Sequence, residues 1–116
     1  MTSDSQGADL PEEGLSTAQI AEAVKVTRQT VNNWKDRGLL PAPEVLHLGA
    51  RGRASVWPTY ALPLALFVEE ALKKRPVAQV ARQIKPLLEK DPAWVNAQIA
   101  SGKTITLLLR ELAPGI

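Results

Sequence analysis

The stretch that decides the fold covers residues 16–41 and reads STAQIAEAVKVTRQTVNNWKDRGLLP. It opens with Ser16 followed three residues later by Gln19, which is the spacing of a capping box at the start of a helix. Apolar side chains then recur on one side at helical spacing, at Ile20, Ala21 and Val24. This pattern predicts a helix of about two turns whose apolar side faces the core.

A second helix is expected after the short link Lys25-Val26, with Thr27 as its N-cap. It should run over residues 27–37, because Gly38 readily takes the left-handed backbone that ends many helices. Val31 and Trp34 are three residues apart and should face inward. The unit is therefore a helix, a short turn and a second helix.

The outward positions of helix 27–37 carry side chains that suit DNA. A helix-turn-helix docks its second helix in the major groove, with the N-terminal residues of that helix nearest the base edges. Arg pairs with guanine O6 and N7, Gln and Asn pair with adenine N6 and N7, and Thr and Lys hold phosphates. The expected DNA contacts are Thr27, Arg28, Gln29, Thr30, Asn32, Asn33 and Lys35. The other interpretation of this polar side is a solvated helix surface without a partner.

A β-hairpin is expected next. Alternating apolar residues between Val45 and Trp57 flank the glycine- and arginine-bearing segment 49–53. Arg51 and Arg53 have no acidic neighbour on this loop, so they join the expected DNA contacts. We call residues 47–57 the wing.

The rest of the chain predicts further helices. One should start at Thr59 or Leu62 and end near Lys74, and an apolar stripe over residues 77–88 predicts another, which Pro86 should end or kink. Asp91 should cap a helix that starts at Pro92, and a last stripe covers residues 105–112. The fold class is mainly α: a winged helix-turn-helix with a two-stranded hairpin and extra C-terminal helices. The expected divisions are a disordered acidic tail (1–14), the winged domain (15–90) and a C-terminal helical segment (91–116).

Apolar residues in the C-terminal segment allow two interpretations. They could form the interface of a homodimer, or cover the domain's own preceding helices. The residues concerned are Trp94, Val95, Ile99, Ile105, Leu108, Leu109 and Leu112. Trp34, Trp57 and Trp94 are all expected in the core, because aliphatic residues surround each of them, rather than stacked on bases.

Composition excludes several classes of function. The chain has 116 residues, no cysteine and a single histidine, His47, so thiolate or His-rich metal sites are not expected. No acid/base pair or nucleophile site stands out, so neither an enzyme nor a cofactor is predicted. No apolar run approaches the roughly 20 residues that span a bilayer, and a cytoplasmic, nucleoid-associated protein is expected.

The net charge of +2 conceals an uneven distribution. Residues 1–14 hold four carboxylates and no basic side chain, so the remainder carries +6. A basic body favours a phosphate-rich partner, although many basic domains bind none.

Three segments resemble the winged helix-turn-helix of the MerR superfamily of bacterial regulators: STAQIAEAV (16–24), VTRQTVNNW (26–34) and RGLLP (37–41). The wing and Trp57 also stand where that family has them. The resemblance implies a helix in the major groove, with Arg28, Gln29 and Asn32 at bases or groove, and a wing that brings Arg51 and Arg53 to the backbone or minor groove. Asn32 and Asn33 replace the arginine and aromatic residue that are usual in the family, and Ser55 replaces a usual wing arginine. The long dimerisation helix and the metal-sensing cysteines of the family are missing, which argues against a sensor.

Two hypotheses of function follow. The first is a sequence-specific duplex-DNA-binding protein, a MerR-like transcriptional regulator of bacterial or phage origin that acts as a dimer. The second is an assembly or packaging subunit, similar to the small terminase subunits of tailed phages, or an excisionase-like architectural factor. The segment Asn32-Asn33-Trp34-Lys35 is similar to both of these last groups, which share the winged fold.

Overall fold

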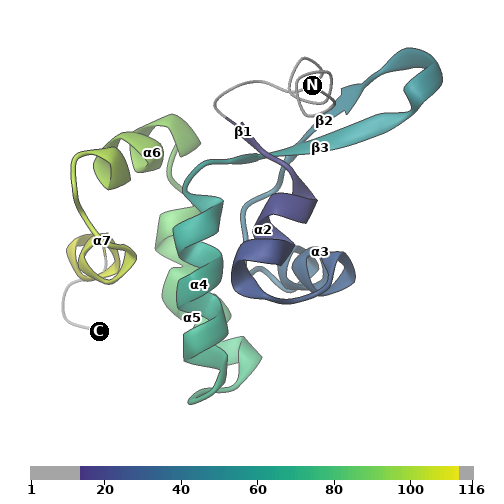
Figure 1. Cartoon of the computed structure of the whole chain (residues 1–116). Coiled ribbons are helices and arrows are strands. Elements are labelled where there is room, and N and C mark those ends of the chain that lie inside the picture. The colour runs from purple at the N-terminus through teal and green to yellow at the C-terminus, as the bar shows by residue number, and fades with distance from the viewer. Residues whose placement is uncertain (1–13, 113–116) are drawn as a thin grey trace.

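Short helices and a small antiparallel sheet, whose hairpin extends away from the helices, make up the computed structural model of this chain, which describes residues 14–112 (Figure 1). The expected architecture, mainly α with a hairpin after two helices, is confirmed. The elements in chain order are β1 (Gly14–Leu15), α2 (Thr17–Val24), α3 (Arg28–Asp36), β2 (Glu44–His47), a 3₁₀ turn (Gly49–Arg51), β3 (Arg53–Pro58), α4 (Ala61–Leu72), α5 (Val77–Leu88), α6 (Pro92–Ala100) and α7 (Ile105–Leu112).

Capping side chains set the helix starts that the sequence predicts. The Gln19 N–H donates to Ser16 Oγ at 3.1 Å, and the Ser16 N–H donates to Gln19 Oε1 at 2.7 Å, so the capping box at the start of α2 is confirmed. Asp91 caps α6 by accepting from the Ala93 N–H at 3.4 Å, with Pro92 as the first helical residue. These bonds satisfy N–H groups that a helix start leaves without partners.

The sheet has three strands in the order β1-β3-β2, one more than the hairpin alone. The hairpin pairs Val45 with Ser55 and His47 with Arg53. β1 adds Gly14 opposite Pro58, which corrects the assignment of Gly14 to the acidic tail. Gly14 suits this position because a Cβ there would collide with the Val56 side chain. The other tail residues, 1–13, lie outside the described part of the chain.

Buried side chains from α2 through α7 form one hydrophobic core. Ile20 of α2, Val31 of α3, Leu64 of α4, Ile84 of α5 and Leu108 of α7 are all completely inaccessible to solvent. The helix-turn-helix and the C-terminal helices therefore stabilise each other by burying shared apolar surface. The division at residue 90 into two segments stays a prediction.

Pro86 does not end α5, which continues for two residues to Leu88. Proline removes one helix hydrogen bond and crowds the preceding turn. Pro86 stands in the last turn, and its neighbours Ile84 and Leu87 are fully buried in the core. Core packing therefore holds the final turn despite the proline.

The expectation for the tryptophans is confirmed for Trp34 and Trp57 and wrong for Trp94. Trp57 is fully buried and Trp34 is 8% exposed, whereas Trp94 is 39% exposed, with the Lys90 ammonium 5.7 Å from its ring centroid. Neighbouring residues of a helix point about 100° apart. Because α6 turns Val95 into the core, Trp94 is directed away from it.

Candidate nucleic-acid interface

Thr27 starts α3 as the sequence predicts. Its hydroxyl accepts from the Thr30 N–H at 3.0 Å, and the two threonine hydroxyls lie 2.9 Å apart. Thr27 is exposed and Thr30 is half-buried. These hydroxyls already stabilise the first turn of α3, so any phosphate they meet is an additional partner.

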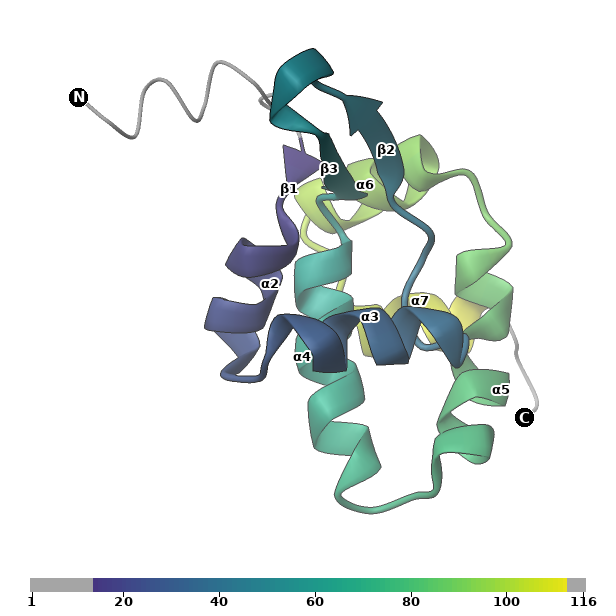
Figure 2. The same cartoon turned by 90° about the vertical axis from the view of Figure 1, so that its right-hand side faces the viewer.

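The two sides of α3 differ sharply. Val31 is fully buried and Trp34 is 8% exposed, so this side of the helix belongs to the core. The opposite side is formed by Arg28, Gln29, Asn32 and Asn33, which are all exposed, and Lys35 stands at its border with 34% of its side chain exposed. In Figure 2 the helix runs across the near face of the molecule, in front of α4 and α7.

A turn with left-handed backbone fixes each helix of the pair. Lys25, at φ 64°, ends α2, and the Val26 N–H donates to the Ala21 carbonyl at 2.9 Å. Gly38, at φ 79°, follows α3, and the Leu39 N–H donates to the Trp34 carbonyl at 2.8 Å. Such bonds satisfy carbonyls at the helix ends. The first turn sets how α3 leaves α2, and the second brings the buried Leu39 into the core.

The hairpin is tied to the helix pair through Trp57. Its indole Nε1 donates to Thr17 Oγ1 at 2.9 Å, which links β3 to the first residue of α2 across 40 positions of sequence. Arg51 closes the 3₁₀ turn at the hairpin tip and Arg53 opens β3. The hairpin extends away from the helices in Figure 1 and rises above α3 in Figure 2. The exposed side of α3 and the arginine-bearing tip thus stand on one fixed framework.

Residues 6–38 match a family model described as a homeodomain-like domain. The match supports a helix-turn-helix DNA-binding domain. It covers α2 and α3 and ends at Gly38, so the hairpin and α4 to α7 lie beyond the helix-turn-helix that it describes. It does not single out the MerR superfamily. Comparisons with curated proteins and with solved structures find no match to the chain.

Several exposed residues of the helix-turn-helix are absent from the residues expected to contact DNA, and one of them lies on the outward side of α3. Asp36 is the last residue of α3, and 69% of its side chain is exposed. It follows Gln29 by seven residues, which returns a helix to the same side after about two turns. The spacing could have identified Asp36 from the sequence. It is missed because the expected DNA contacts are chosen among cationic, amide and hydroxyl side chains, and Asp36 is a carboxylate.

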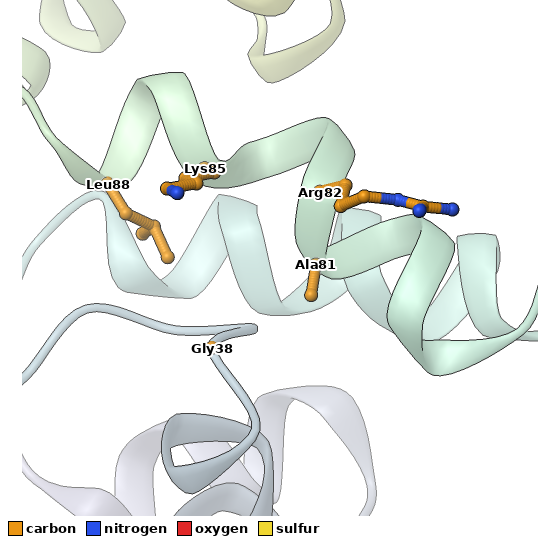
Figure 3. Close-up of a pocket in the computed structure, with 5 residues that line it drawn as sticks. All are labelled: Gly38, Ala81, Arg82, Lys85 and Leu88. Carbon is orange, nitrogen blue, oxygen red and sulfur yellow. The ribbon is translucent and has the colours of Figure 1, made fainter.

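A shallow cavity of about 310 Å³ lies between α5 and the turn after α3, lined by Gly38, Ala81, Arg82, Lys85 and Leu88 (Figure 3). Ala81 and Leu88 point toward the loop that carries Gly38, and the Arg82 side chain extends along α5 away from it. The two charged lining residues are exposed. The cavity therefore lies at the boundary between α5 and the C-terminal end of the helix-turn-helix.

Three further features concern residues 14–112: metal-binding groups, the adjacent carboxylates of α4 and membrane-spanning helices. No group of three or more His, Asp or Glu side chains is placed to hold a metal ion there. Lys73 Nζ lies 3.5 Å from both Glu69 Oε2 and Glu70 Oε2, and these carboxylates, Glu69 first, raise the pKa of Lys73. The adjacent carboxylates are therefore a surface ion-pair group. In the same range, no helix has the length and apolar character needed to cross a membrane.

The structure divides the residues expected at a dimer interface. All four of the buried residues are covered by the chain's own elements: Val95 by the packing of α6 beside β3, and Ile105, Leu108 and Leu109 by the packing of α7 against α4 and α5. This burial matches the second interpretation of the segment, in which these residues cover preceding helices. The surface that remains accessible comes from Trp94, Ile99 and Leu112. Dimerisation through this segment stays a prediction that depends on those three residues.

Proposed function

We propose that this protein binds duplex DNA in a sequence-dependent way, with α3 in the major groove. The single observation that carries the proposal is the exposed polar side of α3, formed by Arg28, Gln29, Asn32 and Asn33, opposite a side locked into the core. A buried apolar side gives the helix a fixed orientation, so its polar groups need little reorganisation on binding. The helix-turn-helix match supports the same proposal.

Each group on this side of α3 has a defined partner in the groove. Arg28 suits guanine O6 and N7, and Gln29 and the two asparagines suit adenine N6 and N7. Thr27, Thr30 and Lys35 border this side and suit phosphates, as do Arg51 and Arg53 at the hairpin tip. Bases read by α3 would supply specificity, while phosphate contacts would supply most of the affinity.

The finer proposal is a MerR-like transcriptional regulator that acts as a dimer. It is supported by a hairpin directly after the helix pair and by two antiparallel helices, α4 and α5, after the hairpin. A single recognition helix covers only a few base pairs, and two copies on paired half-sites are the usual way to gain affinity. The accessible Trp94, Ile99 and Leu112 offer apolar surface for such pairing.

The test is selection of bound duplexes from a random pool with the full chain, followed by titration of the enriched sequence by fluorescence anisotropy. Arg28→Ala with Gln29→Ala should remove discrimination between the enriched and a scrambled duplex. Arg51→Ala with Arg53→Ala should weaken both duplexes alike and reduce the slope of log K against log salt by about 0.9 for each phosphate that is no longer neutralised. Arg110→Ala is the matched control, because Arg110 is exposed on α7, across α4 and α5 from α3.

The outcomes separate the hypotheses. An enriched motif with two related halves supports the dimeric regulator, and a single half supports a monomeric reader. Equal binding to all duplexes contradicts sequence reading by α3 and favours the packaging or architectural role. No binding to any duplex by the folded wild-type chain contradicts DNA binding altogether.

A further inference from the structure

Asp36 is an exposed carboxylate on the side of α3 that is proposed to enter the groove. Seven residues separate it from Gln29, so the two lie about 20° apart around the helix and about 10.5 Å apart along its axis. Val31 and Trp34, on the opposite side, are buried. Asp36 and Gln29 therefore form one outward line, and Asn32 and Asn33 flank it.

Helix stability does not explain an aspartate at this position. A negative charge in the last turn of a helix is opposed by the helix dipole, and aspartate is a weak helix former. Its ion-pair partner is the adjacent Lys35, whose Nζ lies 3.6 Å from Asp36 Oδ1, and exposed pairs of this kind contribute little. The carboxylate thus keeps free acceptor capacity that points outward.

A carboxylate facing a polyanion is repelled unless it meets a hydrogen-bond donor. In the major groove the donors are the amino groups of cytosine and adenine, while guanine O6 and N7 and thymine O4 are acceptors. Ionised aspartate only accepts hydrogen bonds. The adenine amino group has acceptors on both sides in the major groove, its own N7 and thymine O4, which repel the second carboxylate oxygen. Cytosine N4 has an acceptor on one side only, the O6 of its paired guanine, and a C–H on the other side.

We propose that Asp36 determines specificity by accepting a hydrogen bond from cytosine N4. The separation of about 10.5 Å along the helix axis equals at most about three base-pair steps of 3.4 Å, so this cytosine lies within about three base pairs of the one that Gln29 reads. Asp36 also disfavours every other base at that position, since it meets acceptors or a methyl group there. The inference rests on the proposed function, because it needs α3 in the major groove.

The test compares motifs selected from one random pool by the full-length wild type, Asp36→Asn and Lys35→Gln. The wild-type motif should contain a cytosine preference that Asp36→Asn loses, by about tenfold in the affinity ratio for duplexes that differ only there. Asparagine pairs with adenine, so the preference should move to adenine while the rest of the motif stays. Lys35→Gln should keep the cytosine and lower affinity for all duplexes alike.

Each result has one meaning. A wild-type motif that Asp36→Asn reproduces unchanged overturns the role of Asp36 and leaves the proposed function intact. The same motif bound uniformly more tightly by Asp36→Asn also overturns it, since the carboxylate then acts only as a repelling charge. A wild type that enriches no motif overturns the proposed function itself. Asp36→Asn removes a charge that the helix dipole opposes, so loss of folding is not expected, and circular dichroism checks this.

Discussion

Tyr60 provides a stability prediction that one signal can follow. It is the only tyrosine in the chain, it precedes α4, and it is 1% exposed. Its hydroxyl is buried and has no hydrogen-bond partner among the described residues. Burial disfavours the tyrosinate anion and raises the pKa of Tyr60 from 10.0 to about 12.

The sign and size of the effect follow from this shift. The unfolded chain releases the phenolic proton near pH 10 and the folded chain near pH 12. The contribution of Tyr60 to the free energy of unfolding is fully present below pH 10. It is lost as the pH rises to 12, because in that range only the unfolded state has released the phenolic proton. Two pKa units correspond to about 2.7 kcal/mol of unfolding free energy.

Absorbance of the tyrosinate gives the pKa directly, because no second tyrosine contributes. We expect titration near pH 12 in the folded protein and near pH 10 in strong denaturant. Tyr60→Phe should remove this alkaline loss of stability. At neutral pH the variant should unfold at a similar or higher denaturant concentration, because burying a hydroxyl without a hydrogen-bond partner costs about 1–3 kcal/mol and phenylalanine avoids that cost. Titration of the folded wild type near pH 10, with circular dichroism unchanged, would refute the burial argument.

Three further predictions concern the framework that holds α3. Gly38→Ala should lower the free energy of unfolding, measured by chemical denaturation, by about 1–2 kcal/mol. The cause is the left-handed backbone alone, since an added Cβ meets nothing within 4 Å. Gly102→Ala is the control: it should lower stability by a similar amount and leave DNA affinity unchanged. Thr17→Val should leave the Trp57 indole N–H without its partner and lower stability by about 1–3 kcal/mol, and an unchanged melting temperature would count against the link between hairpin and helix pair. Lys25→Gly should raise stability by up to about 1 kcal/mol, since glycine accepts the left-handed backbone that lysine resists, and a lower melting temperature would contradict this.

Local signals in the sequence are sufficient to predict the helix pair. Ser16, Thr27 and Gly38 act within a few residues of their own positions, so the start of each helix and the end of the second can be predicted without knowing the fold. The hairpin is equally local, because its two strands are joined by a short turn. The buried side of α3 also follows from spacing alone.

The sequence-based expectations are wrong where distant parts of the chain decide. Gly14 joins a strand only because β3 lies beside it. Its partner in that strand pair is Pro58, which is 44 positions later in the sequence. Pro86 does not end its helix, because the surrounding core holds the final turn, whereas the alternative of a kink at Pro86 stays a prediction. Trp94 has aliphatic neighbours in the sequence, but α6 packs on the rest of the fold through the side that carries Val95. Val95 is therefore buried and Trp94 is left exposed. The bond between Trp57 and Thr17 is likewise invisible to any local pattern.

The same distinction explains why the DNA contacts can be proposed residue by residue while dimer contacts cannot. On α3 a single buried side, defined by Val31 and Trp34, fixes which residues face outward, so sequence spacing alone finds most of the residues that the structure leaves exposed. In the C-terminal segment most of the apolar side chains are buried in the core of the chain itself, and the accessible Trp94 already has a lysine over its ring. The number of apolar residues in a terminal helix therefore does not indicate a protein partner by itself. Only the apolar surface that remains accessible after the chain has folded can do so. A polar side on a helix whose other side is fully packed is the stronger evidence, because nothing within the fold requires its particular amides and cations.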